Sequence, residues 1–447
     1  MLIPKNPPND FSSLTGLQPD EIQKIFQHVT PLPTGKYLHW EELTHREPPE
    51  GVTHEQWWNA VRFGRTSLMQ LLPLLDKQGQ QFKFAAPGPV LIDLHHIDRD
   101  AAGQINTPIG EPIQEDPKRY LMTSLIEEAI TSSQLEGAST TRKVAAEMLR
   151  IGRKPRDHGE TMIFNNYRTM EHIRGLKGEP ITPERILELH RMLTDGTLDD
   201  PLDAGRLRKT DDVKVVDARD QTIVHEPPTH TELRARLERL CAFANTSESS
   251  SPFVHPVLRA ILLHFMIGYD HPFVDGNGRT ARALFYWSMA RSGYWLMEYT
   301  SISHILRRGP AKYMRAYLHT ETDNNDTTYF LLHQLSTIRR AVIALHKYLA
   351  RKVREQKEME KLLYAAPKLR TRFNHRQVAL LTHALKNTGE GYRVDGHQRS
   401  HNVVNQTARN DLIDLHSLGL LERARQGNAY VFFAPEDLRD RLTALAK

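Results

Sequence analysis

Residues 271–282, His-Pro-Phe-Val-Asp-Gly-Asn-Gly-Arg-Thr-Ala-Arg, lie between two segments that have the residue pattern of helices. Before them, residues 256–269 place apolar side chains on one face of a predicted helix. After them, residues 279–292 are rich in Ala, Leu, Met and Arg, which favour a helix. Gly276 and Gly278 allow a sharp turn and a close approach of a ligand to the backbone. The sequence therefore predicts a glycine-rich loop that ends at a helix N-terminus.

The polar residues of this loop suit a nucleoside triphosphate. Free backbone N–H groups at a helix N-terminus favour an anion. Arg279 and Arg282 are three residues apart, so they share one face of the first turn, where bound phosphates would offset their charge. Asp275 offers a hard oxygen ligand for Mg2+ or Mn2+, and His271 can exchange a proton near neutral pH. We therefore expect a nucleoside triphosphate and a divalent cation here. The alternative is an ordinary polar turn with a capping asparagine.

The stretch resembles the signature of the Fic family, His-Pro-Phe-x-(Asp/Glu)-Gly-Asn-Gly-Arg-x-x-Arg, at every defined position. The resemblance implies a mainly helical core that transfers AMP from ATP to a hydroxyl side chain of a protein. It implies His271 as the catalytic base, Asp275 as the metal ligand, Arg279 on the β-phosphate and Arg282 on the γ-phosphate. It also implies that the nucleotide is bound by Phe273, Gly276, Asn277, Gly278, Arg279 and Arg282.

A second motif precedes the loop in the chain. Residues 117–136 carry a helical apolar stripe, and Gly137 is a natural stop for that helix. Ser132 and Glu136 are four residues apart and face the same side. The segment resembles the Fic inhibitory motif, (Ser/Thr)-x-x-x-Glu-(Gly/Asn), which implies a two-pronged pair between the Glu136 carboxylate and Arg282. ATP would then bind with its triphosphate misplaced. The alternative is an exposed glutamate near a helix end.

Two short β-branched runs, residues 213–216 and 222–225, predict a hairpin. It resembles the Fic flap, whose edge can hold an extended target segment by strand addition. The alternative is a purely structural hairpin. Residues 305–320 predict a helix that contains Tyr313 and Tyr317. In related Fic proteins an aromatic residue of this region lines the adenine pocket, and the resemblance gives that role to Tyr313. A core tyrosine would show the same pattern.

The N-terminal part, residues 1–116, gives weaker signals. Residues 19–28 and 54–75 have helical spacing, and the prolines around the first of these predict loops. Residues 76–116 are polar and are interrupted by prolines and glycines, so we expect connecting loops there. Further helices are predicted at residues 142–150, 160–176, 183–193, 231–244 and 327–361. The segment 183–193, with His190 among its apolar positions, is typical of a helical bundle.

Beyond residue 365 the pattern changes to two helices, residues 376–385 and 403–417, followed by a hairpin. The hairpin strands are predicted at residues 421–424 and 429–433, and the order of elements resembles a winged helix-turn-helix module. Residues 368–447 hold 13 lysine or arginine residues and 8 aspartate or glutamate residues, a net charge of +5. DNA binding and a protein-docking or dimer module are equally compatible with this pattern. Related two-domain Fic proteins often pair, which favours a homodimer.

Composition limits the compartment and the chemistry. The 447 residues contain no apolar run near the ~18 residues that a membrane-spanning helix needs, and residues 1–8 lack the apolar core of a signal peptide. Cys241 is the only cysteine, which excludes an internal disulfide and favours the cytoplasm. We interpret it as a small buried side chain rather than a nucleophile. The 23 histidines include no His-Glu-x-x-His pattern, so we interpret most of them as surface or core residues.

Together these features predict a mainly α-helical chain with four parts: an N-terminal helical region (1–116), a Fic core with a β-hairpin flap and an inhibitory helix (117–345), a linker helix (346–367) and a winged helix-turn-helix domain (368–447). We expect a protein adenylyltransferase that modifies Ser, Thr or Tyr residues, its own included. One alternative is an enzyme that also or mainly removes AMP, since the glutamate can place a water. Another is a relative that transfers phosphate or phosphocholine. Gly278 disfavours it, because the phosphate-transferring branch has lysine there. The third is a DNA-binding regulator with a Fic sensor core.

Overall fold

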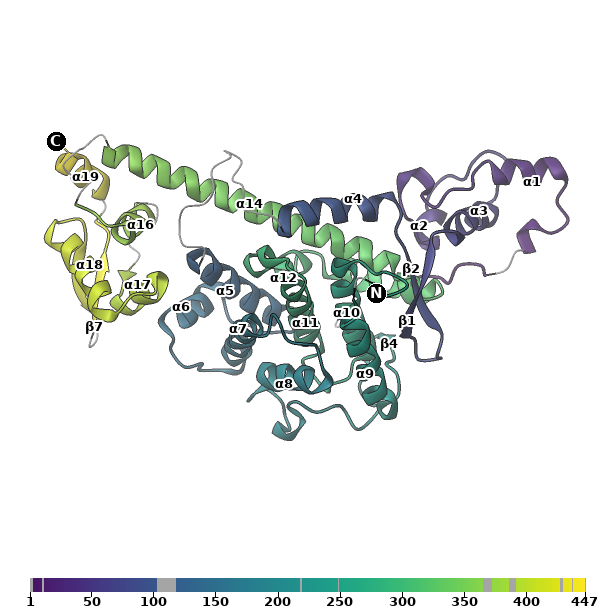
Figure 1. The fold of residues 1–447 in the computed structure, drawn as a ribbon, viewed down its shortest axis with the longest axis horizontal. Helices are drawn as coiled ribbons and strands as arrows, with labels where there is room; N and C mark the ends of the chain where they lie inside the picture. The colour runs from purple at the N-terminus through teal and green to yellow at the C-terminus, as the bar shows by residue number, and fades with distance from the viewer. Residues whose placement is uncertain are drawn as a thin grey trace. The chain divides into compact units, whose positions relative to one another are not determined.

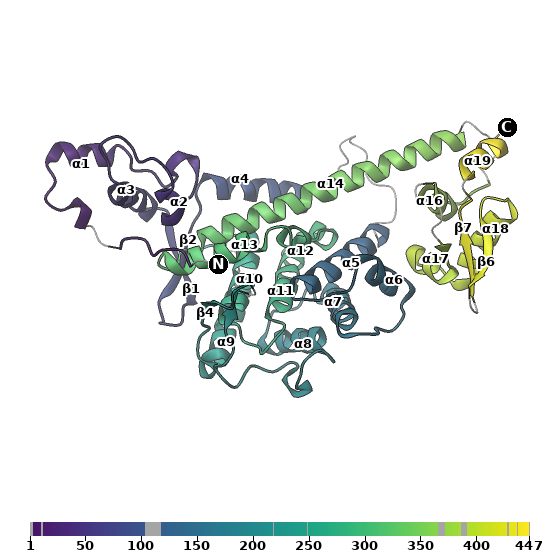
Figure 2. The same cartoon turned by 180° about the vertical axis from the view of Figure 1, so that it is seen from behind.

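Helices dominate the computed structural model, which describes residues 3–9, 12–102, 118–217, 219–247, 249–364, 372–385, 391–426, 429–435 and 437–446. Figure 1 shows the fold and Figure 2 shows it from behind. The chain divides into two compact units. The first unit comprises Met1–Gly103, Glu127–Thr140 and Arg156–Val342, and the second comprises Gln104–Ile126, Thr141–Pro155 and Ile343–Lys447. Within the described ranges, every helix is too short or too polar to cross a membrane.

The first unit holds most of the helices and two short hairpins. Its elements are α1 (Pro19–Phe26), α2 (Trp40–Thr44), α3 (His54–Thr66), β1 (Met69–Leu75), β2 (Gln81–Ala85), α4 (Gly88–Ile97), α7 (His158–Gly175), α8 (Pro183–Thr194), β3 (Val215–Val216), β4 (Ile223–His225), α9 (Leu233–Ala244), α10 (Pro256–Asp270), α11 (Asn277–Arg291), α12 (Ile302–Leu306) and α13 (Pro310–Thr322). Two helices, α5 (Lys118–Leu135) and α14 (Thr328–Tyr364), have residues in both units.

The centre of the first unit is the pair α10 and α11, which lie side by side in both views (Figures 1 and 2). Nearly every residue of both helices is buried, as expected for helices that other elements surround on all sides. Pro256 begins α10, where its missing N–H costs nothing. Because both helices are packed along their whole length, the loop between them is held at both ends.

The hairpin β1–β2 corrects the prediction of one helix over residues 54–75. Helix α3 ends at Thr66, and the chain continues as a strand in which Leu72 and Leu74 are buried while Pro73 is exposed. A proline inside a helix removes a hydrogen bond and clashes with the preceding turn, and alternate burial is the pattern of a strand. The leucines of this segment therefore pack as one face of a hairpin.

The prediction of loops throughout residues 76–116 is also wrong, because β2 and α4 lie in this range; residues 103–116 lie outside the described residues. Phe82 of β2 packs edge-on against Phe265 and Tyr269 of α10, with ring centroids 5.3 and 5.1 Å apart. These aromatic contacts bury the strand on the central helix, which its polar sequence does not reveal.

The other predicted elements of the first unit lie close to the observed ones, with two differences. The predicted hairpin is shorter than expected: β3 and β4 pair antiparallel, with Val215 opposite His225. The helix predicted over residues 305–320 is two helices, since α12 ends at Leu306 and α13 begins at Pro310. Proline is favoured in the first turn of a helix and disfavoured in its interior, which explains the break.

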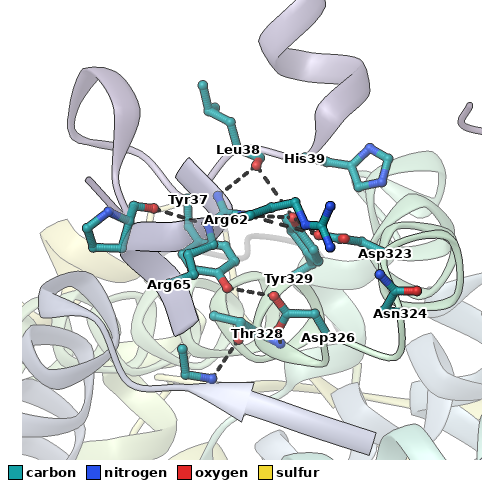
Figure 3. Close-up of polar contacts among 12 residues, drawn as sticks. Tyr37, Leu38, His39, Arg62, Arg65, Asp323, Asn324, Asp326, Thr328 and Tyr329 are labelled. Carbon is teal, nitrogen blue, oxygen red and sulfur yellow. Dashed lines mark hydrogen bonds and ion pairs between the residues drawn. The ribbon is translucent and has the colours of Figure 1, made fainter. Parts of the chain in front are cut away.

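A buried arginine attaches the N-terminal segment to the start of α14 (Figure 3). The Arg65 guanidinium donates to the Leu38 carbonyl (2.8 Å) and to the Tyr329 hydroxyl (2.9 Å). It also lies over the Tyr37 ring, 3.6 Å from its centroid, and Tyr37 donates to the Asp326 carboxylate (2.6 Å). The Arg65 guanidinium lies 3.9 Å from the Asp323 carboxylate, and removing one partner of a buried charge pair costs about 3–5 kcal/mol. This cluster therefore fixes the N-terminal segment on the first unit.

The second unit is built around a small antiparallel sheet with strand order β5-β7-β6. Its own elements are α6 (Arg142–Ile151), α16 (His375–Ala384), β5 (Gly391–Tyr392), α17 (Val394–His401), α18 (Asn405–Ser417), β6 (Glu422–Gln426), β7 (Ala429–Phe433) and α19 (Leu438–Ala446). Leucines of α16, α18 and α19 pack with Phe432 into one core. The predicted hairpin and the two predicted helices are present.

The sequence missed α17 and β5, which lie between the two predicted helices. His397 is the only residue of α17 that is fully buried, so this helix has no apolar stripe that could reveal it. Two predicted features fall on residues outside the described ranges: the centre of the β6–β7 turn, residues 427–428, and the end of the linker, residues 365–367.

Candidate active site

The glycine-rich loop starts with a strained residue. His271 takes the left-handed conformation (φ 43°), and its amide donates to the Ile267 carbonyl at the end of α10. This conformation is unfavourable for a residue that has a Cβ atom, so the surroundings must maintain it. Arg208 supplies support: its amide donates to the Pro272 carbonyl (2.9 Å) and its side chain to the His271 carbonyl (3.1 Å).

The His271 imidazole has the protonation state of a base. Its Nδ1 atom lies 3.3 Å from the Gly268 carbonyl. Because a carbonyl can only accept, Nδ1 carries the proton and Nε2 carries the lone pair. Burial lowers the pKa of His271 from 6.5 to about 4, so the ring is neutral at pH 7. A neutral imidazole with an unprotonated Nε2 is the form that can accept a proton from a hydroxyl.

Asn277 closes the loop on itself. Its side-chain oxygen accepts from the Phe273 amide (3.0 Å), and its side-chain nitrogen donates to the Phe273 carbonyl (2.9 Å). Both residues are buried. The Asn277 side chain therefore fixes the shape of the loop, and its backbone amide is the group that it can offer to a ligand. The nucleotide-binding roles of Asn277 and Phe273 stay predictions.

The first turn of α11 presents unpaired amides. Gly276 precedes it in the left-handed conformation (φ 81°). Within the described part of the chain, no acceptor pairs with the amides of residues 276–279. Four free donors at the positive end of a helix favour an anion. Gly278 lies against Glu136: a Cβ atom added at Gly278 would be 2.2 Å from the Glu136 Oε1 atom.

Ser132 and Glu136, at the end of α5, bind the guanidinium of the fully buried Arg282. Its Nε donates to the Ser132 hydroxyl (2.8 Å), and its Nη2 donates to the Ser132 carbonyl (3.0 Å) and to Glu136 Oε1 (2.8 Å). Glu136 thus makes one hydrogen bond with Arg282 instead of the expected two-pronged pair, and Ser132 accepts from Nε and from Nη2. Burial alone would lower the pKa of Arg282, but the Glu136 carboxylate raises it above its ordinary value.

Arg279 and Asp275 form the other charged pair of the loop. Arg279 is buried, and it donates to the Leu193 carbonyl (3.0 Å) and to the Asp275 carboxylate (3.0 Å). The Asp275 side chain is 55% exposed. Mg2+ commonly binds one or two protein carboxylates and completes its coordination with substrate phosphates and water. The single accessible carboxylate of Asp275 fits a nucleotide-bound Mg2+ or Mn2+.

Helix α5 is anchored by a buried carboxylate. Glu128 accepts from the Ser301 hydroxyl (2.7 Å), the Ser303 amide (3.2 Å) and the Ser303 hydroxyl. The hydroxyls of Thr131 and Ser301 lie 3.1 Å apart. Burial raises the pKa of Glu128. These bonds attach α5 to the start of α12 and so set the position of Glu136, which follows Glu128 by about two turns.

The structure also brings Tyr313 to Arg282. The Tyr313 hydroxyl lies 2.7 Å from His264 Nε2 and 3.4 Å from the Tyr317 hydroxyl. Burial raises the pKa of Tyr313, and the nearby Arg282 partly offsets this shift. The phenol therefore lies beside the arginine that was expected to bind the γ-phosphate, and the role of Tyr313 at the adenine stays a prediction.

Two residues that the sequence did not single out complete the loop: Arg208, described above, and His190 of α8. The fully buried His190 ring stacks on Phe273, and its Nε2 lies 2.9 Å from the Asp275 carbonyl. Burial lowers the pKa of His190 from 6.5 to about 4. A histidine among apolar helix positions was the available signal, and such a residue is more often an ordinary core histidine.

The β3–β4 hairpin is tied to the same helix as the loop. The Nε2 atom of His225 donates to the Tyr269 carbonyl (2.7 Å), two residues before His271. Val216 and Ile223 on the hairpin are exposed, at 40% and 42%. Among the described residues this sheet has only two strands, so each strand has one edge without a strand partner, and strand addition of a target segment stays a prediction.

One further histidine cluster lies outside the loop. His39, Glu41 and His319 come close enough together to hold a metal ion. However, His39 Nδ1 accepts from the Glu41 amide (3.2 Å), and Nε2 lies 3.1 Å from the Thr322 hydroxyl. The rings of His39 and His319 stack face to face, 4.2 Å apart. Because both nitrogens of His39 are engaged, we interpret this cluster as core packing.

Residues 180–289 match the sequence model of the Fic/DOC family. They run from the start of α8 nearly to the end of α11, so they contain His190, the β3–β4 hairpin and the whole glycine-rich loop. Ser132 and Glu136 lie before the matched range.

Curated relatives match part of the chain. It is 31% identical over 186 residues to the protein adenylyltransferase Fic of Nematostella vectensis, covering 40% of each protein. It is 39% identical over 116 residues to the protein adenylyltransferase Fic of Drosophila virilis, covering 26% of this chain and 21% of the relative. The chain thus spans less than half the length of these relatives. A crystal structure of a Fic family protein from Desulfovibrio desulfuricans G20 aligns over 78% of this chain and 96% of its own, with 19% identity and a TM-score of 0.47.

The buried neutral histidines predict that acid destabilises the fold. Burial lowers the pKa of His190 to about 4 and that of His264 to about 3, from 6.5. Between pH 6.5 and about 4 these histidines are protonated in the unfolded chain but neutral in the folded chain. The free energy of unfolding therefore decreases as the pH falls from about 6.5 to about 4. Each histidine contributes roughly 1.4 kcal/mol per pH unit in this window. Thermal unfolding measured from pH 7.5 to pH 4.5 should show a falling Tm, and a constant Tm would contradict this reasoning.

Proposed function

We propose that this chain is a protein adenylyltransferase, which transfers AMP from ATP to the hydroxyl of a Ser, Thr or Tyr residue of a protein, its own residues included. The observation that carries the proposal is the neutral imidazole of His271 next to a helix N-terminus with unpaired amides and two buried arginines. The Fic/DOC domain and the 31% identity to the Nematostella protein adenylyltransferase support it.

In the proposed reaction, Nε2 of His271 takes the proton of the target hydroxyl. The hydroxyl oxygen forms a bond to the α-phosphorus while the bond from that phosphorus to the bridging oxygen of the β-phosphate breaks. Pyrophosphate leaves with the electron pair of the broken bond. The backbone amides of residues 276–279 face the charge that develops on the phosphate oxygens. Because the loop bonds fix these amides beforehand, they stabilise that charge without reorganisation.

The charged side chains of the loop would bind the phosphates. Arg279 would bind the β-phosphate, and Arg282 would bind the γ-phosphate once Glu136 has left it. Asp275 would hold the divalent cation, Mg2+ or Mn2+, which when bound neutralises phosphate charge. A triphosphate would compete with Asp275 for Arg279, so the pair between these residues would loosen as the nucleotide binds.

We propose that Glu136 inhibits the chain in the arrangement described. Its carboxylate occupies Arg282 and lies against Gly278, where a phosphate would approach the amides of α11. A phosphate at Gly278 would be repelled by the Glu136 carboxylate, and Arg282 would not be free to bind it. ATP would therefore bind with its triphosphate misplaced. Release requires the last turn of α5 to leave Arg282, against the bonds that Glu128 makes to Ser301 and Ser303.

Two alternative reactions involve the same residues. The Glu136 side chain is 26% exposed, so it could also orient a water molecule, and an enzyme that also or mainly removes AMP stays a candidate. Transfer of phosphate is less compatible with the site. The resemblance places lysine at position 278 in the phosphate-transferring branch of the family, whereas this chain has Gly278.

The partners expected from the sequence stay proposals. We propose that a target segment lies along the β3–β4 hairpin, where it would present its hydroxyl to His271. The cytoplasmic location and the homodimer are predictions that rest on composition and on the family resemblance.

Replacing the base tests the mechanism. A His271→Ala variant should lose at least about a hundredfold in AMP transfer, because general base catalysis typically contributes 10²–10⁴-fold. Incorporation of α-labelled ATP into protein in a cell lysate measures this rate. His95→Ala, a change at an exposed histidine of α4, should leave the rate unchanged. Label transfer by the His271→Ala variant at the wild-type rate would show that another group is the base.

Removing the inhibitory carboxylate should activate the chain. A Glu136→Gly variant frees Arg282, and the loss of one charge-assisted hydrogen bond predicts an increase in self-labelling on the order of tenfold or more. Glu136→Gln keeps the size but removes the charge, so its rate should lie between those of Glu136→Gly and the wild type. The double variant Glu136→Gly, His271→Ala should be inactive. Equal rates for wild type and Glu136→Gly would rule out the proposed inhibition.

DNA binding by the second unit is a second candidate function, which we propose because one face of α18 exposes Gln406, Arg409 and Asn410. These side chains can form hydrogen bonds with base edges in a major groove. In a gel shift with duplex fragments, Arg409→Ala should weaken binding by about tenfold. Arg439→Ala, at an exposed position of α19, should not. No shift of any fragment by the whole chain would leave protein docking as the role of this unit.

A further inference from the structure

His190 contacts the glycine-rich loop from α8, and no residue type or motif in the sequence gave it a role in the reaction. Its ring lies face to face with that of Phe273, with centroids 3.7 Å apart and planes 5° apart. A Cβ atom at Gly276 would lie 3.3 Å from its Nε2. The imidazole is therefore packed on the Phe273 ring and also lies against the backbone of the loop at Gly276.

The hydrogen bonds of His190 define which nitrogen carries the proton. The Gly205 amide lies 2.9 Å from Nδ1. An amide N–H can only donate, so Nδ1 carries the lone pair and Nε2 carries the hydrogen. Nε2 then donates to the Asp275 carbonyl, 2.9 Å away. The Asp275 carbonyl is therefore oriented by the Nε2–H group of His190, and the His190 ring is in turn oriented by the Gly205 amide.

The direction of the Asp275 carbonyl determines the direction of the next amide. In a planar trans peptide, the carbonyl of one residue and the N–H of the following residue point to opposite sides. With its carbonyl held on α8, the peptide between Asp275 and Gly276 directs the Gly276 amide away from α8. That amide is one of the unpaired donors at the start of α11.

Gly276 itself does not select this orientation. Glycine has no Cβ atom and adopts positive and negative φ about equally readily, so the peptide before it can rotate with little steric cost. The rotated peptide would turn the Asp275 carbonyl toward the phosphate side, where its partial negative charge would repel an anion. Some contact outside the loop must therefore distinguish the two orientations.

The same histidine connects the loop to the segment that leads into the hairpin. Gly205, which orients the His190 ring, lies three residues before Arg208, whose side chain donates to the His271 carbonyl. Residues 205–208 thus support the loop at three carbonyls, that of Asp275 through His190 and those of His271 and Pro272 directly.

We propose that His190 is a positioning residue of the nucleotide loop, which holds the Asp275–Gly276 peptide in the one orientation that presents the Gly276 amide to a phosphate. Its protonation pattern is imposed by the Gly205 amide, and its ring position by the stack on Phe273. The proposal rests on the proposed function only in identifying the bound anion as the triphosphate of ATP.

Three substitutions separate the contacts of His190, each made in the Glu136→Gly background so that Arg282 is free. His190→Gln retains a donor near the position of Nε2, and His190→Asn retains an acceptor near Nδ1 but cannot reach Asp275. His190→Phe retains only the ring that stacks on Phe273. Calorimetric titrations with ATP and with adenosine, together with the KM and kcat of AMP transfer, measure the effect. Thermal unfolding reports whether each variant is folded.

The expected result is a difference specific to phosphate. Relative to the Glu136→Gly parent, His190→Asn and His190→Phe should bind ATP about tenfold more weakly and raise KM for ATP, while His190→Gln should stay within about threefold. Adenosine affinity should be the same in His190→Gln and His190→Asn. Equal ATP affinities of the Gln, Asn and Phe variants, or equal losses for adenosine and ATP, would overturn the proposal. If the parent binds ATP but transfers no AMP, the proposed function fails while the binding data still decide the role of His190.

Discussion

The site depends on how the buried guanidinium of Arg282 is neutralised. A buried charge without partners would be costly, so its donors need acceptors in every state of the chain. In the arrangement described, Ser132 and Glu136 supply them from a helix about 150 residues earlier in the sequence. A triphosphate is the other group with suitable oxygens. The inhibitory contact and substrate binding would therefore be alternative ways to satisfy one buried cation, and their competition follows from its burial.

The surroundings of this arginine are rigid for separate reasons. The side chain of Asn277 fixes the loop internally, His190 and Arg208 brace it from two other elements, and Glu128 anchors α5. Each is a buried or half-buried hydrogen bond to a backbone group or a hydroxyl, so each constrains direction as well as distance. A loop that carries chemistry on a packed helical scaffold is a common solution, because the scaffold limits how far the loop can relax.

The elements that could be predicted from the sequence are those whose residue pattern lies within a short stretch of the chain. The glycine-rich loop, its flanking helices and the helix that ends in Glu136 all have apolar spacing or turn residues that can be recognised within a short window. The sequence did not predict β1–β2 because its leucines also fit a helix, and it did not predict α17 because that helix lacks an apolar stripe. The roles of His190 and Arg208 depend on partners 85 and 63 residues away along the chain. Sequence spacing cannot show such contacts, nor that Ser132 would leave Glu136 a single bond to Arg282.

The left-handed backbone of His271 has a consequence for the evolution and engineering of this chain. Glycine is the residue that this conformation prefers, by roughly 1 kcal/mol, yet glycine has no imidazole. The position that we assign to the base is thus one where the most stable residue and the reactive residue differ. Replacing His271 by glycine would raise the free energy of unfolding but would remove the proposed base. Mutants selected only for thermal resistance would therefore tend to lose the histidine.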